Sequence, residues 1–101
     1  MIVEIVPVAE AELQDAVRYY ESQRPGLGVE FAAAVEEACR NIKEYPRAWQ
    51  KVSGGARRSL LRRFEYGLIY RVRGGVATIY AVMHLKRRPD YWRDRLKPRS
   101  T

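Results

Sequence analysis

Hydrophobic and polar positions at the start of the chain alternate with a period of two. Residues 2–6 read IVEIV, so that β-branched residues flank Glu4, and Pro7 follows directly. β-branched side chains favour strands, whereas proline cannot donate to the hydrogen-bond ladder of a central strand. This pattern predicts a short strand that Pro7 ends.

From Ala9 onward, apolar residues recur at spacings of three and four, which is the period of a helix. Two such stripes follow each other, and the turn-forming pair Pro25-Gly26 separates them while Pro46 ends the second. The first stripe consists of Ala9, Leu13, Ala16, Val17 and Tyr20. The second consists of Phe31, Val35, Ala38, Ile42 and Tyr45. We expect a hairpin of two amphipathic helices whose stripes face the core.

The second half of the chain is rich in strand-forming residues. Residues 66–73 and 76–83 are β-branched and aromatic, and Gly74-Gly75 between them is a two-residue hairpin signal. Residues 57–64 read RRSLLRRF. Alternation along this stretch predicts one face with Arg58, Leu60, Arg62 and Phe64 and a second with Arg57, Ser59, Leu61 and Arg63. After Pro89 the sequence turns polar and basic, which predicts a short helical turn and a loose tail.

This order of elements predicts an α+β fold in a single domain of residues 1–101. It consists of an N-terminal strand, a helical hairpin and an antiparallel sheet of three or more strands. Helices that cover one face of such a sheet leave its other face free for a partner.

The composition of the chain predicts the cellular compartment of the protein. No apolar run reaches the roughly 18–20 residues that cross a bilayer, and the first residues lack the layout of a signal peptide. Cys39 is the only cysteine, and its helical spacing among apolar residues indicates a small core residue rather than a reactive thiol. Without a disulfide framework or a targeting segment, we expect a cytoplasmic protein that makes no contact with a membrane.

The net charge of +7 is distributed unevenly. Residues 1–50 carry 5 Lys/Arg against 9 Asp/Glu, a net charge of −4, whereas residues 51–101 carry 14 against 3, a net charge of +11. The basic second half predicts an anionic partner, either nucleic acid or an acidic protein segment or both. The alternative is a solvated arginine-rich surface.

Few residues suggest catalysis. One histidine, one cysteine and scattered carboxylates form no metal-ligand cluster, and no glycine-rich phosphate loop occurs, so we expect no metal and no cofactor. His84 is a candidate general acid–base for attack by a ribose 2′-hydroxyl, although a hydrogen-bonded structural role is favoured. Tyr91 and Trp92 suit base stacking, with Tyr91 also a candidate catalytic phenol, or they pin the C-terminus onto the core, which is favoured for Trp92.

Three segments of the chain, together with the order of its elements, resemble the RelE/ParE superfamily of type II toxins over almost the entire sequence. They read YYESQRPGLGVEF, RRFEYGLIYRV and IYAVMHLKRRPDYWRDR. The resemblance implies a toxin that an acidic antitoxin neutralises in a hetero-oligomeric complex by binding across the helical hairpin and the sheet. RelE-type members enter the ribosome and cleave mRNA, whereas ParE-type members bind DNA gyrase and block it without cleaving a bond.

The resemblance to the cleaving enzymes is incomplete. Arg58 matches the first of two basic positions before the Tyr-x-Leu-x-Tyr segment, but Leu60 occupies the second. Gly67 and Leu85 stand where further arginines are expected, and Tyr91 matches a C-terminal tyrosine. Losing one cationic group that stabilises a cleaving phosphate typically lowers the rate on the order of 100-fold or more. The ParE-type activity, inhibition of gyrase, is therefore favoured over a ribosome-dependent endoribonuclease, and a general nucleic-acid-binding module is the third alternative.

These interpretations assign residues to three sites. The expected antitoxin-binding residues are Leu13, Val17, Tyr20, Arg58, Leu60 and Arg62. The expected target-binding residues are Arg71, Arg73, Arg87, Arg88, Tyr91 and Trp92. If the protein is an endoribonuclease, the candidate catalytic residues are Arg58, Arg63, His84, Arg87 and Tyr91.

Overall fold

A computed structural model describes residues 1–98 of the chain. The elements are β1 (Ile2–Ile5), α1 (Pro7–Gln23), α2 (Leu27–Glu44), β2 (Gln50–Lys51), the 3-10 turn η1 (Ser53–Gly55), β3 (Arg57–Leu60), β4 (Tyr66–Arg73), β5 (Val76–His84) and the 3-10 turn η2 (Arg93–Leu96). No helix in this part of the chain has the length and apolar character that a membrane crossing requires.

The strands form a five-stranded sheet in the order β1-β5-β4-β3-β2. Neighbours from β2 to β5 pair antiparallel, but β1 joins the far edge parallel to β5, with Ile2 opposite Val76. The predicted α+β fold is confirmed, and the sheet differs from the prediction in being mixed. The two helices between β1 and the other strands form a connection long enough for a parallel pair.

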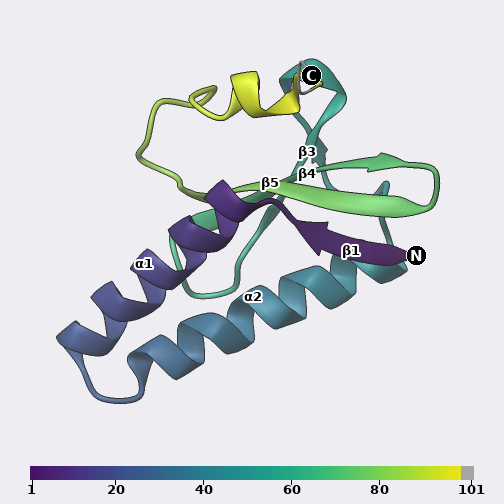
Figure 1. Ribbon diagram of the computed structural model, residues 1–101. Coiled ribbons are helices and arrows are strands. Elements are labelled where there is room, and N and C mark those ends of the chain that lie inside the picture. Colours follow the sequence, from purple (N-terminus) through teal and green to yellow (C-terminus); the bar gives the residue numbers. More distant parts are fainter. Residues whose placement is uncertain (99–101) are drawn as a thin grey trace.

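The sheet is the middle of three layers (Figure 1). Both helices cover one face, called the inner face here, and the main core lies beneath them around Phe31, Leu68 and Ile79. The segment after β5, ending in η2, lies over the opposite face, called the outer face (Figure 1). Trp92 and Leu96 from this segment pack on outer-face residues in a second apolar cluster. The prediction that this face is left free is therefore wrong where the segment covers it.

A bulge in β5 determines which residues near its end reach the inner face. The register between β4 and β5 shifts between Ile69 and Tyr70. Both Ile79 and Val82 consequently belong to the inner core, although they are an odd number of positions apart. His84, two residues further on, therefore lies on the same side as Tyr66, with which it is paired.

Two sequence-based predictions fail at the ends of elements. β3 stops at Leu60, and the chain then turns through Arg63 with φ 68°, so Leu61 and Phe64 both pack on the inner core instead of on opposite faces. The strand alternation predicted for residues 57–64 holds only as far as Leu60. Tyr45, predicted in the second helical stripe, follows the end of α2 and is exposed, because a residue before proline disfavours helical geometry.

The helical hairpin closes through Glu21 and Gly28. The Glu21 carboxylate accepts hydrogen bonds from the backbone amides of Gly26 and Gly28, which satisfies donors at the start of α2. A Cβ atom on Gly28 would come within 2.7 Å of the Val17 carbonyl oxygen on α1. Only glycine therefore allows the two helices to approach this closely.

Candidate functional site

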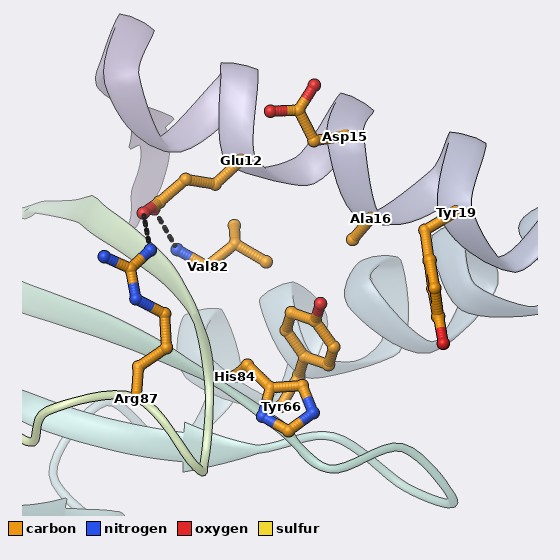
Figure 2. A pocket seen from close by; sticks show the side chains of 8 residues that line it. All are labelled: Glu12, Asp15, Ala16, Tyr19, Tyr66, Val82, His84 and Arg87. Carbon is orange, nitrogen blue, oxygen red and sulfur yellow. Dashed lines mark hydrogen bonds and ion pairs between the residues drawn. The ribbon is translucent and has the colours of Figure 1, made fainter.

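A polar pocket of about 290 Å³ lies between α1 and the end of β5. Figure 2 shows its lining residues, which come from α1, β4, β5 and the segment after β5. They are Glu12, Asp15, Ala16, Tyr19, Tyr66, Val82, His84 and Arg87. The two residues that the sequence assigned to chemistry here are His84 and Arg87.

Glu12 is the centre of the hydrogen-bond network beside this pocket. Its carboxylate accepts a bond from the Val82 backbone amide at 3.0 Å, from the Tyr91 hydroxyl at 2.7 Å, and from both terminal nitrogens of Arg95 at 2.8 and 3.0 Å. Its side chain is only 16% exposed. Glu12 thus connects α1, β5 and the C-terminal segment.

Neither Glu12 nor Arg95 was predicted as a site residue from the sequence. A usable signal was present, because Glu12 falls between Ala9 and Ala16 on the apolar stripe of the first helix. A carboxylate within such a stripe needs a buried cationic or donor partner. Nothing in the spacing identified Arg95 as that partner among the many C-terminal arginines.

Arg87 and Tyr91 form a stacked pair next to Glu12. The guanidinium of Arg87 lies 3.8 Å from the centre of the Tyr91 ring and 4.0 Å from the Glu12 carboxylate. Burial, and then the hydrogen bond to Glu12, raise the pKa of Tyr91. The Tyr91 phenol therefore stays protonated and donates to Glu12. In this state it is unsuited to act as a catalytic base.

His84 is fixed by a local hydrogen bond. Its Nδ1 accepts from the Lys86 backbone amide at 3.0 Å, and its ring packs edge-on against Tyr66 with 5.0 Å between centres. Neutral imidazole with Nδ1 as acceptor carries its proton on Nε2. With Nδ1 engaged by the backbone, Nε2 is the ring nitrogen left available to the pocket.

The structure does not gather the five candidate catalytic residues. Arg58 lies on the outer face, where it donates to the Gln50 side chain at 2.7 Å. Arg63 lies beside α2 and pairs with Glu30 at 3.4 Å. Only His84, Arg87 and Tyr91 lie on the same side of the molecule, near Glu12.

An uncharged row crosses the outer face where β3, β4 and β5 meet. Leu60 is paired with Gly67, and Gly67 is paired with Met83. A Cβ atom on Gly67 would lie 3.0 Å from the Arg58 side chain, so a larger residue there would displace that arginine. This row contains two of the positions where the resemblance to cleaving enzymes expected cations.

The expected antitoxin-binding residues lie on two separate surfaces. Leu13, Val17 and Tyr20 are half-buried against the inner core, and Tyr20 stacks on Phe31 with 5.1 Å between ring centres. Arg58 and Leu60 lie on the outer face, where Leu60 is 55% exposed. Arg62 pairs with Glu37 of α2 at 3.7 Å. These side chains do not form one continuous surface.

The expected target-binding residues also differ in their surroundings and do not form one exposed set. Trp92 is 1% exposed, so the prediction that it contacts a target is wrong and the alternative of an anchor agrees with its burial. Arg71 donates to the carbonyls of Gly54 and Leu96, and Arg88 pairs with Asp90 at 3.5 Å. Arg73 is exposed at the end of β4.

Seven of the thirteen cations in residues 51–98 have a carboxylate of this part of the chain nearby. Those with such a pair within residues 1–98 are Arg62, Arg63, Lys86, Arg87, Arg88, Arg95 and Lys97. The expectation that the arginines gather, unpaired, on one open sheet surface is therefore wrong for five of the ten arginines between residues 51 and 98. Exposed pairs contribute only about 0–1 kcal/mol each, so an acidic partner can still exchange them.

Groups of three or more potential metal ligands do not occur within residues 1–98. The carboxylates of the pocket instead pair with arginines, as in Glu12 with Arg95 and Asp15 with Arg18. The paired carboxylates and arginines of the polar pocket can bind a polar ligand through ion pairs and hydrogen bonds.

Comparisons with known proteins agree on a family. The family model described as the ParE toxin of the type II toxin–antitoxin system, parDE, matches residues 3–89. A solved structure described as the chromosomal ParDE toxin–antitoxin system from P. aeruginosa has a chain with a TM-score of 0.62 at 17% identity. The match covers 85% of this chain and 97% of that chain, which shows a shared fold. A search of curated proteins found no match.

Proposed function

Because the chain belongs to the ParE toxin family of type II toxin–antitoxin systems, we propose that it binds DNA gyrase and blocks it without cleaving nucleic acid. Gyrase acts on DNA in the cytoplasm, which fits the compartment expected from the sequence. The observation that carries the choice of a binding toxin over a nuclease is the uncharged row of Leu60, Gly67 and Met83.

The chemistry near this row argues against phosphate cleavage. A cleaving site must present donors to the charge that develops on the phosphate, and each missing donor lowers the rate on the order of 100-fold. Tyr91, the remaining aromatic candidate, donates its hydroxyl proton to Glu12 at 2.7 Å. The uncharged row and Tyr91 are therefore better suited to binding a partner than to cleaving a phosphate bond.

A supercoiling assay tests the proposal. The purified chain is expected to inhibit DNA supercoiling by gyrase at micromolar concentration and to leave added RNA intact. His84→Ala is expected to inhibit equally well, because the proposal gives the imidazole no chemical step. Unchanged supercoiling in the presence of a micromolar excess of the chain would contradict it.

The runner-up is a ribosome-dependent endoribonuclease, which the common position of His84 and Arg87 in the polar pocket favours. It predicts codon-phased cuts in translated mRNA, detected by primer extension. These cuts should disappear in the His84→Ala, Tyr91→Phe double variant.

The partner that silences the toxin is an antitoxin whose docking path crosses Arg40. A groove of about 430 Å³ between β1 and the two helices includes the apolar side chains of Leu13, Val35 and Cys39. Its charged lining residues are Arg40 and the carboxylates Glu4, Glu10 and Glu36, so an acidic segment would find a cation only at the Arg40 end. Arg40 also lines a second hollow beside α2, together with Arg62 and Arg63. An amphipathic acidic segment can bury apolar side chains in the groove and pair its carboxylates with these arginines.

Charge reversal tests this path. Arg40→Glu is expected to weaken binding of the antitoxin encoded beside this gene by about tenfold or more, because a like-charge contact in an interface costs several kcal/mol and about 1.4 kcal/mol already lowers affinity tenfold. The control is Arg18→Glu, an exposed position on α1 that lines neither hollow. The affinity of each variant for the antitoxin is measured by calorimetry. An equal loss of affinity in both variants would contradict a contact between the antitoxin and Arg40.

A further inference from the structure

Four cations surround a hollow on the outer face, at the end of the sheet formed by the β4–β5 hairpin. The hollow has a volume of about 330 Å³, and none of the residues among 1–98 that line it is acidic. Arg71 and Arg73 come from β4, whereas Arg93 and Lys97 come from the C-terminal segment. We call these four residues and the space between them the basic hollow.

Arg71 is held in a fixed orientation at the base of the hollow. Its terminal nitrogens donate to the carbonyl oxygens of Leu96 at 3.0 Å and Gly54 at 3.5 Å. Its guanidinium also lies 5.4 Å from the centre of the Tyr80 ring. These contacts are with neutral groups, so no carboxylate within residues 1–98 compensates the charge of Arg71.

The other cations are exposed, and their charge is largely uncompensated. Arg73 and Arg93 make no ion pair or side-chain hydrogen bond with any residue of the described chain, 1–98. Lys97 is 3.4 Å from Asp94, but both side chains are more than 70% exposed, so that pair is weak. This differs from Arg87 and Arg95, which share the carboxylate of Glu12, a side chain that is 16% exposed.

The surroundings of the hollow distinguish between two kinds of anionic ligand. A protein segment normally anchors itself with apolar contacts at the centre of its interface. No large apolar side chain that is exposed within residues 1–98 lines the hollow, and its Leu96 is 8% exposed and packed in the outer cluster. Binding that depends on cations without apolar contact is typical of nucleic-acid backbones.

We propose that the basic hollow binds backbone phosphates of a DNA duplex without regard to sequence. This inference goes beyond the proposed function and does not depend on gyrase. The hollow shares no lining residue with the polar pocket, the groove between β1 and the helices or the hollow beside α2. Guanidinium groups suit this ligand, since each presents paired donors to phosphate oxygens.

A matched pair of double variants tests the site. The binding of a short fluorescein-labelled DNA duplex is measured by anisotropy between roughly 50 and 200 mM salt. Arg73→Gln with Arg93→Gln is expected to weaken binding about tenfold and to reduce the slope of log K against log salt by about 2, or about 1 per lost phosphate contact. Arg18→Gln with Lys43→Gln removes the same charge from the helices and is expected to change the slope far less.

A measurement on the unmodified chain keeps the test independent of any folding defect. Adding the duplex to isotope-labelled protein is expected to shift the amide resonances of Gly54, Arg71 and Lys97. Equal losses in both double variants, or shifts confined to the helices, would overturn the proposal. A poly-glutamate peptide that displaces the duplex at equal charge concentration would also overturn it, because it would indicate an acidic protein ligand.

The gyrase assay separates this inference from the proposed function. If the chain inhibits gyrase but no variant affects DNA binding, only the basic hollow is wrongly assigned. If the duplex binds as expected and supercoiling is unaffected, only gyrase inhibition fails.

Discussion

The two faces of the sheet are covered by different means. On the inner face, two long amphipathic helices bury Phe31, Ile42 and Leu68 in a continuous apolar layer. On the outer face, a short segment without helical periodicity is held by Trp92, Leu96 and the bonds of Glu12. A polar, basic stretch of sequence can therefore close a core when two apolar side chains and one carboxylate fix its position.

The strongest test of this comparison is to remove the apolar anchor of the outer face. Trp92→Ala is expected to lower the free energy of unfolding by about 3–5 kcal/mol, because it leaves a large cavity under the C-terminal segment. Phe31→Ala, on the inner face, should have a similar effect. Urea unfolding measures both, and a loss below about 1 kcal/mol for Trp92→Ala would show that the segment contributes little to the core.

The next largest effect is expected from the polar anchor. Glu12→Gln leaves Arg95, which is 20% exposed, without its counter-ion, and should cost about 2–3 kcal/mol of unfolding free energy. The control on the same helix is Asp15→Asn, whose pair with Arg18 is more than 70% exposed and should be worth less than about 1 kcal/mol. Equal losses in the two variants would contradict a special role for Glu12.

A substitution between α1 and α2 tests whether the helical layer can be destabilised without affecting the sheet. Gly28→Ala places a Cβ atom 2.7 Å from the Val17 carbonyl oxygen and is expected to cost about 1–3 kcal/mol by pushing α1 and α2 apart. Val29→Ala, at an exposed neighbouring position, should change stability by less than about 0.5 kcal/mol. Hydrogen exchange in Gly28→Ala should increase in the helices while β5 keeps its protection.

The smallest expected effect is on the pH dependence of stability. The pKa of Tyr91 is raised above 10 in the folded chain, so the unfolded chain loses this proton first as pH rises. Stability from this group is complete below pH 10 and declines above it, at up to about 1.4 kcal/mol per pH unit. Tyr91→Phe should flatten the decline between pH 10 and 11 in urea unfolding, and an unchanged slope would argue against a buried, Glu12-bonded phenol.

Sequence periodicity was sufficient to predict the inner half of this fold. The stripes through Ala16 and Phe31 and the hairpin at Gly74-Gly75 identified both helices and the central strands, because each depends on local spacing. The parallel pairing of β1 and the cover formed by Trp92 depend on contacts between distant residues, which local spacing does not encode.

The candidate site was predicted less completely for the same reason. His84 and Arg87 were identified by residue type, and they do line one pocket. Arg58 and Arg63 were grouped with them by chemistry alone, but the end of β3 and the turn at Arg63 separate them. Charge counting also could not show which arginines find a carboxylate, since that depends on where Glu12, Glu30 and Glu37 lie in space.

The pairing of β1 with β5 has a consequence for the order in which the chain folds. Ile2 and Glu4 leave the ribosome well before their partners Val76 and Thr78, which lie far along the sequence. Such non-local contacts slow folding, because a long loop must close before they form. The helical hairpin can assemble during translation, whereas the edge strand docks only when the β4–β5 hairpin has emerged, so a nascent toxin lacks this edge of its sheet until then.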